Sequence, residues 1–281
     1  MSKRFKDSLK EAIAVITIIA TGLTIIGFSL KDLFPFQTLS WYFAIILRTI
    51  ILTVILILFT VIIFIVKGSK YKNKMTIHIG KNSVTVMTGD LFKEDYWRVI
   101  PMDTHFETVV DDKVISKKSL HGQLILNHGN ENDIKEVIKE EAKKRHIELA
   151  SDGKYHFELG TVIPYECEDG HYLMVALTRL DEKNEAHTTM SEYEYTLMKM
   201  WKNINGKYGL HRIVLPVLGS GITRFDDNQD DVESLMRCML CTLNTSKVYF
   251  KSDICIVIHE DCINSKESLY ELKNVIRIAK G

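Results

Sequence analysis

The stretch "LPVLGSGITRF", residues 215–225, follows a β-branched run and places two glycines and two hydroxyl side chains where a buried strand would end. In open α/β sheets, ligands bind beyond the carboxyl ends of the strands. Glycine lets the backbone approach a phosphate closely, and successive N–H groups form an anion-binding concavity. The stretch therefore predicts a phosphate-binding loop. On this loop alone, an ordinary structural turn is an equal alternative.

The same loop lacks the features of two common nucleotide motifs. It has neither the Lys-Ser/Thr pair of a Walker loop nor the third glycine of a Rossmann fingerprint. The hydroxyl groups of Ser220 and Thr223 can add donors to those of the backbone, so a diphosphate could be held without a lysine.

Short β-rich runs alternate with helical patterns over the C-terminal two thirds of the chain. The runs predict strands over residues 75–80, 83–90, 96–103, 161–166, 171–178, 212–219 and 253–260. Helices are expected within residues 130–149, 191–209, 230–244 and 265–280, the first with an Asn or Asp start signal and the second with Ser191 as its N-cap. This alternation is typical of an α/β sheet covered on both faces.

Charge and cysteine content exclude some classes of function. The 281 residues include 36 Lys+Arg and 36 Asp+Glu, and the C-terminal two thirds contain no basic stripe that would neutralise nucleic-acid phosphates. The five cysteines are odd in number and scattered, so a disulfide framework is not expected. Cys238 and Cys241 form a C-x-x-C inside an amphipathic helical pattern, with no second pair to complete a zinc site. Core packing is the favoured interpretation, and the sequence assigns no metal ligand.

Two apolar runs near the N-terminus are long enough to cross a bilayer core of about 30 Å as helices. Residues 12–30 contain no charge, and residues 41–66 are interrupted only by Arg48. A cleaved signal peptide explains the first run badly, because no small-residue cleavage site follows it. The alternative to a span is a buried core helix. Arg48 could extend outward to the membrane interface or face a partner helix.

Basic residues flank this hairpin on one side. Lys3, Arg4, Lys6 and Lys10 precede the first run, Lys67, Lys70, Lys72 and Lys74 follow the second, and the connecting loop has only Lys31, offset by Asp32. The positive-inside rule then predicts that both ends are cytoplasmic. Residues 67–74 form the expected basic linker, and residues 75–281 the expected cytosolic domain.

A second motif supports the glycine loop. In "VTVMTGDLF" a predicted strand ends at Gly89 and Asp90, which places a carboxylate at the same sheet edge, where it can accept from an exocyclic amine such as that of adenine. Together, "TGDLF", "IVLPVLGSGITRF" and the final strand "ICIVIHED" resemble the macro domain, which binds ADP-ribose. The resemblance covers about residues 75–281 and implies a three-layer α/β/α domain with a mixed sheet.

The resemblance also implies roles for individual residues. Asp90, with Leu91 beside it, would contact the adenine amine. Gly219, Ser220, Gly221, Ile222 and Thr223 would wrap the diphosphate. Phe225 would stack near the adenine, and filling of the core is an equally weighted alternative for this ring.

The chain departs from the macro domains that remove ADP-ribose, which carry an asparagine-rich strand end followed by a run of glycines. Ile100 and Asp103 stand in place of the asparagines, and Gly122 alone remains of the glycine run. Asp103, His105 or Asp111 could still activate a water. Because the usual apparatus is absent, we expect binding without turnover, no catalytic residue and no cofactor.

The altered stretch "MDTHFETVVDDKVISKKSLHGQ", together with the two spans, is similar to the membrane-anchored macro-domain effectors of Thoeris-type bacterial antiphage defence. That family resemblance implies a signal derived from ADP-ribose, a histidine conjugate, made from NAD by a partner TIR enzyme. It implies that the distal ribose and its attached group are contacted by Asp103, Thr104, His105, Phe106, Thr108, Ser119, His121 and Gly122. An ordinary loop role is the alternative for each. His187 and Thr188, between a predicted strand and a predicted helix, could also face the pocket, and a helix-cap role is their alternative.

The resulting hypothesis is a sensor and effector in one chain at the bacterial inner membrane. Ligand binding would drive self-association of the hairpins, with Gly22, Gly27 and Arg48 as contact points, and the assembly would disrupt the membrane. The alternatives are a membrane-tethered ADP-ribosyl hydrolase and a reader of ADP-ribosylated targets.

Overall fold

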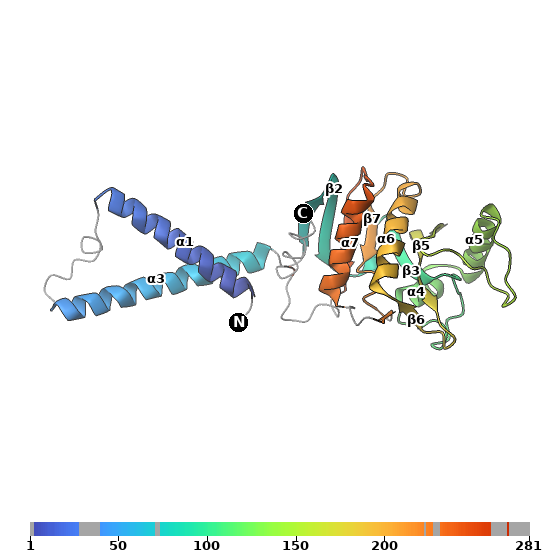
Figure 1. Ribbon diagram of the computed structural model, residues 1–281, viewed down its shortest axis with the longest axis horizontal. Helices are drawn as coiled ribbons and strands as arrows, with labels where there is room; N and C mark the ends of the chain where they lie inside the picture. Colours follow the sequence, from blue (N-terminus) through green and yellow to red (C-terminus); the bar gives the residue numbers. More distant parts are fainter. Residues whose placement is uncertain are drawn as a thin grey trace. The chain divides into compact units, whose positions relative to one another are not determined.

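A computed structural model describes residues 3–27, 40–70, 74–221, 223–226, 231–259 and 269. The chain divides into two compact units, residues 1–72 and 73–281 (Figure 1). Several expectations fall outside the described residues: the loop before Ser40, Ile222, Cys262 and, apart from Leu269, the helix expected over residues 265–280.

The first unit contains helices α1 (Lys3–Ile25) and α3 (Trp41–Lys70). By length and composition both could cross a membrane, with a mean hydropathy of 1.6 for the first and 3.3 for the second. Only 11% and 6% of their apolar windows are buried, whereas the core helix of a soluble protein is mostly buried. The helix α1 starts nine residues before the predicted span, and α3 continues into the predicted linker.

The two helices of this unit run antiparallel and contact each other near the start of α1 and the end of α3. Lys67 Nζ lies 2.7 Å from Glu11 Oε1, and the Arg4 guanidinium lies 3.7 Å from the centre of the Phe64 ring. Both helix ends therefore lie at one end of the hairpin, as a shared side of the membrane would require. A Cβ on Gly22 would meet no described atom within 4 Å, so this glycine does not lie in the contact between α1 and α3.

The second unit is built on a mixed sheet. Its strands are β1 (Lys74–Ile79), β2 (Asn82–Thr88), β3 (Trp97–Asp103), β4 (Val162–Cys167), β5 (Gly170–Leu180), β6 (Ala186–Thr188), β7 (Ile213–Pro216), β8 (Arg224–Phe225) and β9 (Ile254–Ile258). Among the described residues their order is β1-β2-β9-β7-β3-β5-β6-β8, with β4 paired to β5. The strands β2, β9, β7, β3 and β5 are parallel, so their carboxyl ends share one edge.

Helices cover both faces of this sheet. The helices α6 (Met190–Asn205) and α7 (Val232–Ser246) lie side by side over one face (Figure 1), where Trp201 Nε1 donates to Thr242 Oγ1 at 3.2 Å. On the other face, Ile134 and Ile138 of α5 (Glu131–Lys144) join a core with Met174 and Val257. The predicted three-layer α/β/α arrangement with a mixed sheet is confirmed.

Local boundaries differ in places from the sequence predictions. Asn130 caps α5 as predicted, because its side chain accepts from the backbone N–H of Asn132 at 2.9 Å. Ser191 is not the N-cap of α6: Thr189 is, and its hydroxyl oxygen accepts from the N–H of Glu192. The two short strands β6 and β8 and the short helix α4 (Leu120–Gln123) were not predicted, since segments of this length carry too little periodicity.

The C-x-x-C lies in α7, with its first thiol in the core. Cys238 is buried and Cys241 is half-buried. Burial raises the pKa of the Cys238 thiol to about 12, so it remains protonated at neutral pH and is a poor metal ligand or nucleophile. This environment agrees with the packing interpretation.

Candidate functional site

The carboxyl ends of the central strands surround a cavity of about 390 Å³. Strands β3, β5, β7 and β9, the loop after β7 and the segment around α4 all contribute to its wall. The lining residues are Pro101, Met102, Asp103, Val114, Ile115, Lys118, Ser119, Leu120, His121, Gln123, Leu177, Thr178, Leu180, Asn184, Ala186, Pro216, Val217, Gly219, Ser220, Gly221, Thr223, Val257, Ile258 and His259. A mostly apolar wall with a few polar groups, at this volume, is typical of a small-molecule site.

The glycine loop after β7 forms one wall of the cavity. Gly219 has φ +83°, a left-handed conformation that side chains other than glycine rarely adopt, and a Cβ there would lie 3.2 Å from the Phe225 ring. Ser220 closes a turn, because its backbone N–H and its hydroxyl both donate to the carbonyl of Val217. Among the described residues, no protein acceptor receives the N–H of Gly219 or Gly221. These two amides are therefore available to an anion.

A buried tyrosine holds this loop against α6. The hydroxyl of Tyr193 donates to the carbonyl of Leu218 at 2.7 Å, and both residues are fully buried. Burial raises the pKa of Tyr193 well above its usual value, so the hydroxyl keeps its proton and remains a donor. The carbonyl before the glycine turn is thereby directed into the core.

We expect Tyr193→Phe to lower the free energy of unfolding by about 1–2 kcal/mol, because a buried carbonyl loses its donor without any change in packing volume. Urea denaturation followed by circular dichroism measures this difference. Tyr195→Phe is the matched control on the same helix, since Tyr195 is exposed. An equal effect of both substitutions would contradict the anchoring role of Tyr193.

The short helix α4 brings two of the predicted residues to the cavity. Ser119 is its N-cap: its hydroxyl oxygen accepts from the N–H of Gly122 at 3.0 Å. His121 is buried, and its Nε2 lies 2.7 Å from the carbonyl oxygen of Glu107. Burial lowers the pKa of His121, so the ring is neutral at neutral pH, with its proton on Nε2 and Nδ1 as an acceptor.

Gly122 has a packing role and does not line the cavity. A Cβ at this position would lie 2.2 Å from the carbonyl oxygen of Ser116, a distance that no side chain tolerates. The glycine lets α4 start directly against the preceding loop, and this places Ser119 and His121. Its effect on a ligand would be indirect.

Asp103 ends β3 and presents a buried carboxylate to the cavity. It accepts from the backbone N–H groups of His105 at 2.7 Å and Glu107 at 3.1 Å. Burial raises the pKa of this carboxyl, but the His105 ring 3.4 Å away, the nearby His121 and the two backbone N–H donors lower it by more, so that it lies below its usual value. The group is therefore an ionised acceptor, suited to a ligand hydroxyl, ammonium or imidazole N–H.

Other residues predicted from the loop after β3 do not line this cavity. The backbone of Thr104 bonds to Thr178 and Phe157, and Phe106 packs edge-to-face on Phe157 with ring centres 5.1 Å apart. Thr108 is buried, with its hydroxyl directed toward Glu131. His105 lies in a separate cluster, described below.

Of the three groups considered for water activation, only Asp103 lines the cavity. His105 does not reach it. The side chain of Asp111 is exposed and accepts from the N–H groups of Lys113 and Val114, each at 2.8 Å. This carboxylate stabilises its own turn.

Asp90 and Leu91 lie at the end of β2, one strand away from the cavity wall. Gly89 N–H donates to the carbonyl of Ile258, which does line the cavity. The Asp90 carboxylate accepts from Phe92 N–H at 3.1 Å and caps the short 3₁₀ helix Leu91–Lys93, while Leu91 is buried in the core. Asp90 is thus at the sheet edge as predicted, but it is outside the lining.

Phe225 is placed differently from a base-stacking residue. It is buried beneath the glycine loop, with its ring 5.4 Å from that of Tyr193 in an edge-to-face contact. The core-filling alternative describes this ring. The Phe225 ring packs against Gly219 and does not line the cavity.

Several polar residues of the cavity wall were not singled out from the sequence: Lys118, Gln123, Thr178, Asn184 and His259. Lys118 belongs to the segment that distinguished the chain from hydrolases, yet nothing in its neighbours indicates that it faces a cavity. His187 lies near this cavity but does not line it. Its Nδ1 lies 2.9 Å from Asp226 Oδ1.

A mixed α/β sheet with this strand order, a left-handed glycine turn after β7 and a cavity at the carboxyl edge define a domain of the macro type. A family model described as "Thoeris protein ThsA, Macro domain" matches residues 84–259. The chain belongs to this ThsA macro-domain family, which confirms the resemblance found in its sequence.

The chain is also similar to individual proteins. The chain is 29% identical over 238 residues to the Thoeris protein ThsA of Bacillus amyloliquefaciens (strain Y2), covering 80% of this chain and 78% of that protein. Among solved structures, it is similar to the Oceanobacillus iheyensis macrodomain with ADP, at 13% identity and a TM-score of 0.49, covering 73% of this chain and 95% of that one. A Trypanosoma brucei macrodomain in complex with ADP-ribose has 10% identity and a TM-score of 0.43, covering 70% and 69%.

Proposed function

We propose that this protein is a membrane-anchored sensor whose macro domain binds a nucleotide derived from ADP-ribose. The observation that carries the proposal is the glycine turn on the cavity wall, where the N–H groups of Gly219 and Gly221 have no described protein acceptor. A pyrophosphate bound there would accept from both amides. Lys118 is a cation in the same wall.

The remaining lining fits the other parts of such a ligand. Apolar side chains such as Val257 and Ile258 offer a surface for a base, with Asp90 at the end of the neighbouring strand to accept from its amine. At the other side, Asp103 and His121 offer a carboxylate and a neutral imidazole acceptor. An ionised carboxylate favours a ligand whose distal group carries N–H donors, as a histidine conjugate of ADP-ribose does.

The output of the sensor is proposed to act on the inner membrane. A partner TIR enzyme would make the signal from NAD, and the occupied cytoplasmic domain would favour self-association of the hairpins. The ligand can shift that equilibrium only by its difference in affinity for the two states. Assembly of helices as apolar as α3 would then disrupt the bilayer during antiphage defence.

Calorimetric titration of the full chain in detergent micelles tests the ligand. We expect saturable binding of ADP-ribose, and tighter binding of its histidine conjugate because Asp103 gains a donor. Cyclic ADP-ribose is the control, since its closed ring removes the free distal end. Equal affinity for all three nucleotides, or no binding of any, would contradict the proposal.

One observation favours an ADP-ribosyl hydrolase as a second candidate: Asp103 places a carboxylate in the cavity wall, where it could accept a proton from an attacking water. Chromatography of the same incubations separates the two functions. A sensor releases no product, whereas an enzyme converts many equivalents of an ADP-ribose conjugate per chain. Retention of ADP-ribosylated protein in preference to free nucleotide would instead identify a reader.

A further inference from the structure

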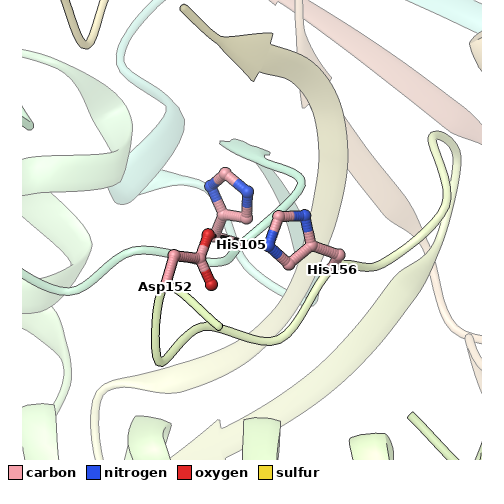
Figure 2. Close-up of side chains that lie close together, drawn as sticks. All are labelled: His105, Asp152 and His156. Carbon is pink, nitrogen blue, oxygen red and sulfur yellow. Dashed lines mark hydrogen bonds and ion pairs between the residues drawn. The ribbon is translucent and has the colours of Figure 1, made fainter. Parts of the chain in front are cut away.

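Outside the ligand cavity, two histidines and a carboxylate converge at the surface of the macro domain (Figure 2). His105 belongs to the loop after β3, and Asp152 and His156 belong to the segment between α5 and β4. One potential ligand atom from each residue lies within 4.8 Å of the others. We propose that this cluster binds a divalent transition-metal ion such as Zn²⁺.

The two segments are joined by contacts that do not involve the three side chains. Phe157 N–H donates to the carbonyl of Thr104 at 2.9 Å, and Lys154 Nζ pairs with Glu107 Oε2 at 2.7 Å. The contact between the aromatic rings of Phe106 and Phe157 lies beside them. The convergence of His105, Asp152 and His156 is therefore set by the fold, which is what a preorganised site requires.

One polar atom of the cluster, on His105, lacks a hydrogen bond, whereas Asp152 and His156 bond to each other. His105 is only 15% exposed, and its buried Nδ1 makes no hydrogen bond among the described residues. The nearest carboxylate oxygen, that of Asp103, lies 3.4 Å from this nitrogen. A metal on the other ring nitrogen would fix the proton on Nδ1 and direct it to Asp103, the carboxylate–histidine–metal arrangement that orients many metal-binding histidines.

The geometry can close on an ion with small side-chain rotations. Tetrahedral zinc with bonds of about 2.0–2.1 Å needs ligand atoms about 3.4 Å apart. His156 Nε2 already lies 2.8 Å from Asp152 Oδ2, and the centres of the His105 and His156 rings are 4.5 Å apart. Asp152 and His156 are 46% and 51% exposed, so both can rotate without repacking the core.

The donor set decides the class of ion. Two imidazoles and one carboxylate suit zinc and similar transition metals, whereas Mg²⁺ and Ca²⁺ require oxygen ligands. Three protein ligands leave a fourth position to water. The bound ion would fasten the loop after β3 to the segment 150–157, and it would brace Asp103 through His105.

A competition titration tests the site. The full chain, purified in detergent without a histidine tag and stripped with EDTA, is titrated with ZnCl₂ against a chromophoric chelator. We expect one zinc per chain at this site with micromolar or tighter affinity, and a higher melting temperature with zinc than with EDTA. Asp152→Asn and His156→Ala should each weaken this binding at least tenfold while leaving the melting temperature in EDTA unchanged.

His187→Ala is the matched control, because His187 lies with Asp181 and Glu185 in the other described group of this kind. In that group both ring nitrogens of His187 already lie beside carboxylates, and Glu185 is paired with Arg224, so it is not proposed to bind metal. Retention of zinc by His187→Ala together with its loss from His156→Ala supports the proposal. The proposal is overturned if no zinc binds with a dissociation constant below 100 µM, which corresponds to about 5.5 kcal/mol, or if the Asp152→Asn/His156→Ala double variant binds zinc unchanged.

Discussion

Gly221→Val is expected to lower the affinity of the protein for ADP-ribose about 100-fold, or about 2.8 kcal/mol, without affecting its stability. Gly221 lines the cavity, and a Cβ at this position would meet no described atom within 4 Å. The backbone therefore tolerates a side chain, while the added methyl groups occupy open space beside the amides that would hold the pyrophosphate. Calorimetric titration with ADP-ribose, paired with thermal unfolding, measures both quantities.

Gly219→Ala is the informative companion because it should lower affinity and stability together. Its left-handed backbone strains any L residue, and its Cβ would press on the Phe225 ring. Gly206→Val is the matched control at the end of α6, where the nearest described atom to an added Cβ is 4.0 Å away. If Gly221→Val and Gly219→Ala both kept full affinity in a folded protein, the phosphate loop would be the wrong location for the nucleotide.

The sequence predicted the parts of this protein that depend on periodicity and on turn chemistry. Alternating apolar residues identified the long strands, and the glycines after β7 indicated the cavity wall that Gly219 and Gly221 form. Both signals are local. Asp103 was found as a departure from a family pattern, and its burial at the end of β3 gives that departure a physical role.

The rest of the site depends on contacts between segments far apart in the chain. For Phe225 the sequence left stacking near the base and filling of the core as equal alternatives, because no local pattern distinguishes them; in the structure the ring packs on Tyr193. The convergence of His105 with His156 likewise depends on the path of the segment between α5 and β4. Gly122 matches a glycine position of the family motif, but the structure requires glycine there for packing. An added Cβ would lie 2.2 Å from the carbonyl oxygen of Ser116.

Removal of residues 1–72 is expected to transfer the protein completely from the membrane fraction to the soluble fraction, with ADP-ribose affinity within twofold of the full chain. The division between the two compact units falls at this boundary. In α3, 19 Leu, Ile, Val and Phe side chains contribute about 6–11 kcal/mol to insertion, whereas Arg48 costs at most about 3.5 kcal/mol. We therefore expect the hairpin to provide the membrane affinity, whereas the cavity is lined entirely by residues of the second unit.

Carbonate extraction of cell membranes followed by immunoblotting measures the distribution, and calorimetry of the purified 73–281 fragment measures its binding. Arg48→Leu is the control, since replacing the one charge within the apolar run should leave the protein in the membrane. This pair also separates anchoring from assembly: if Arg48 contacts a partner helix, its replacement will reduce self-association without releasing the chain. Recovery of the fragment with the membranes, or extraction of the full chain by carbonate, would show that α1 and α3 are not its anchor.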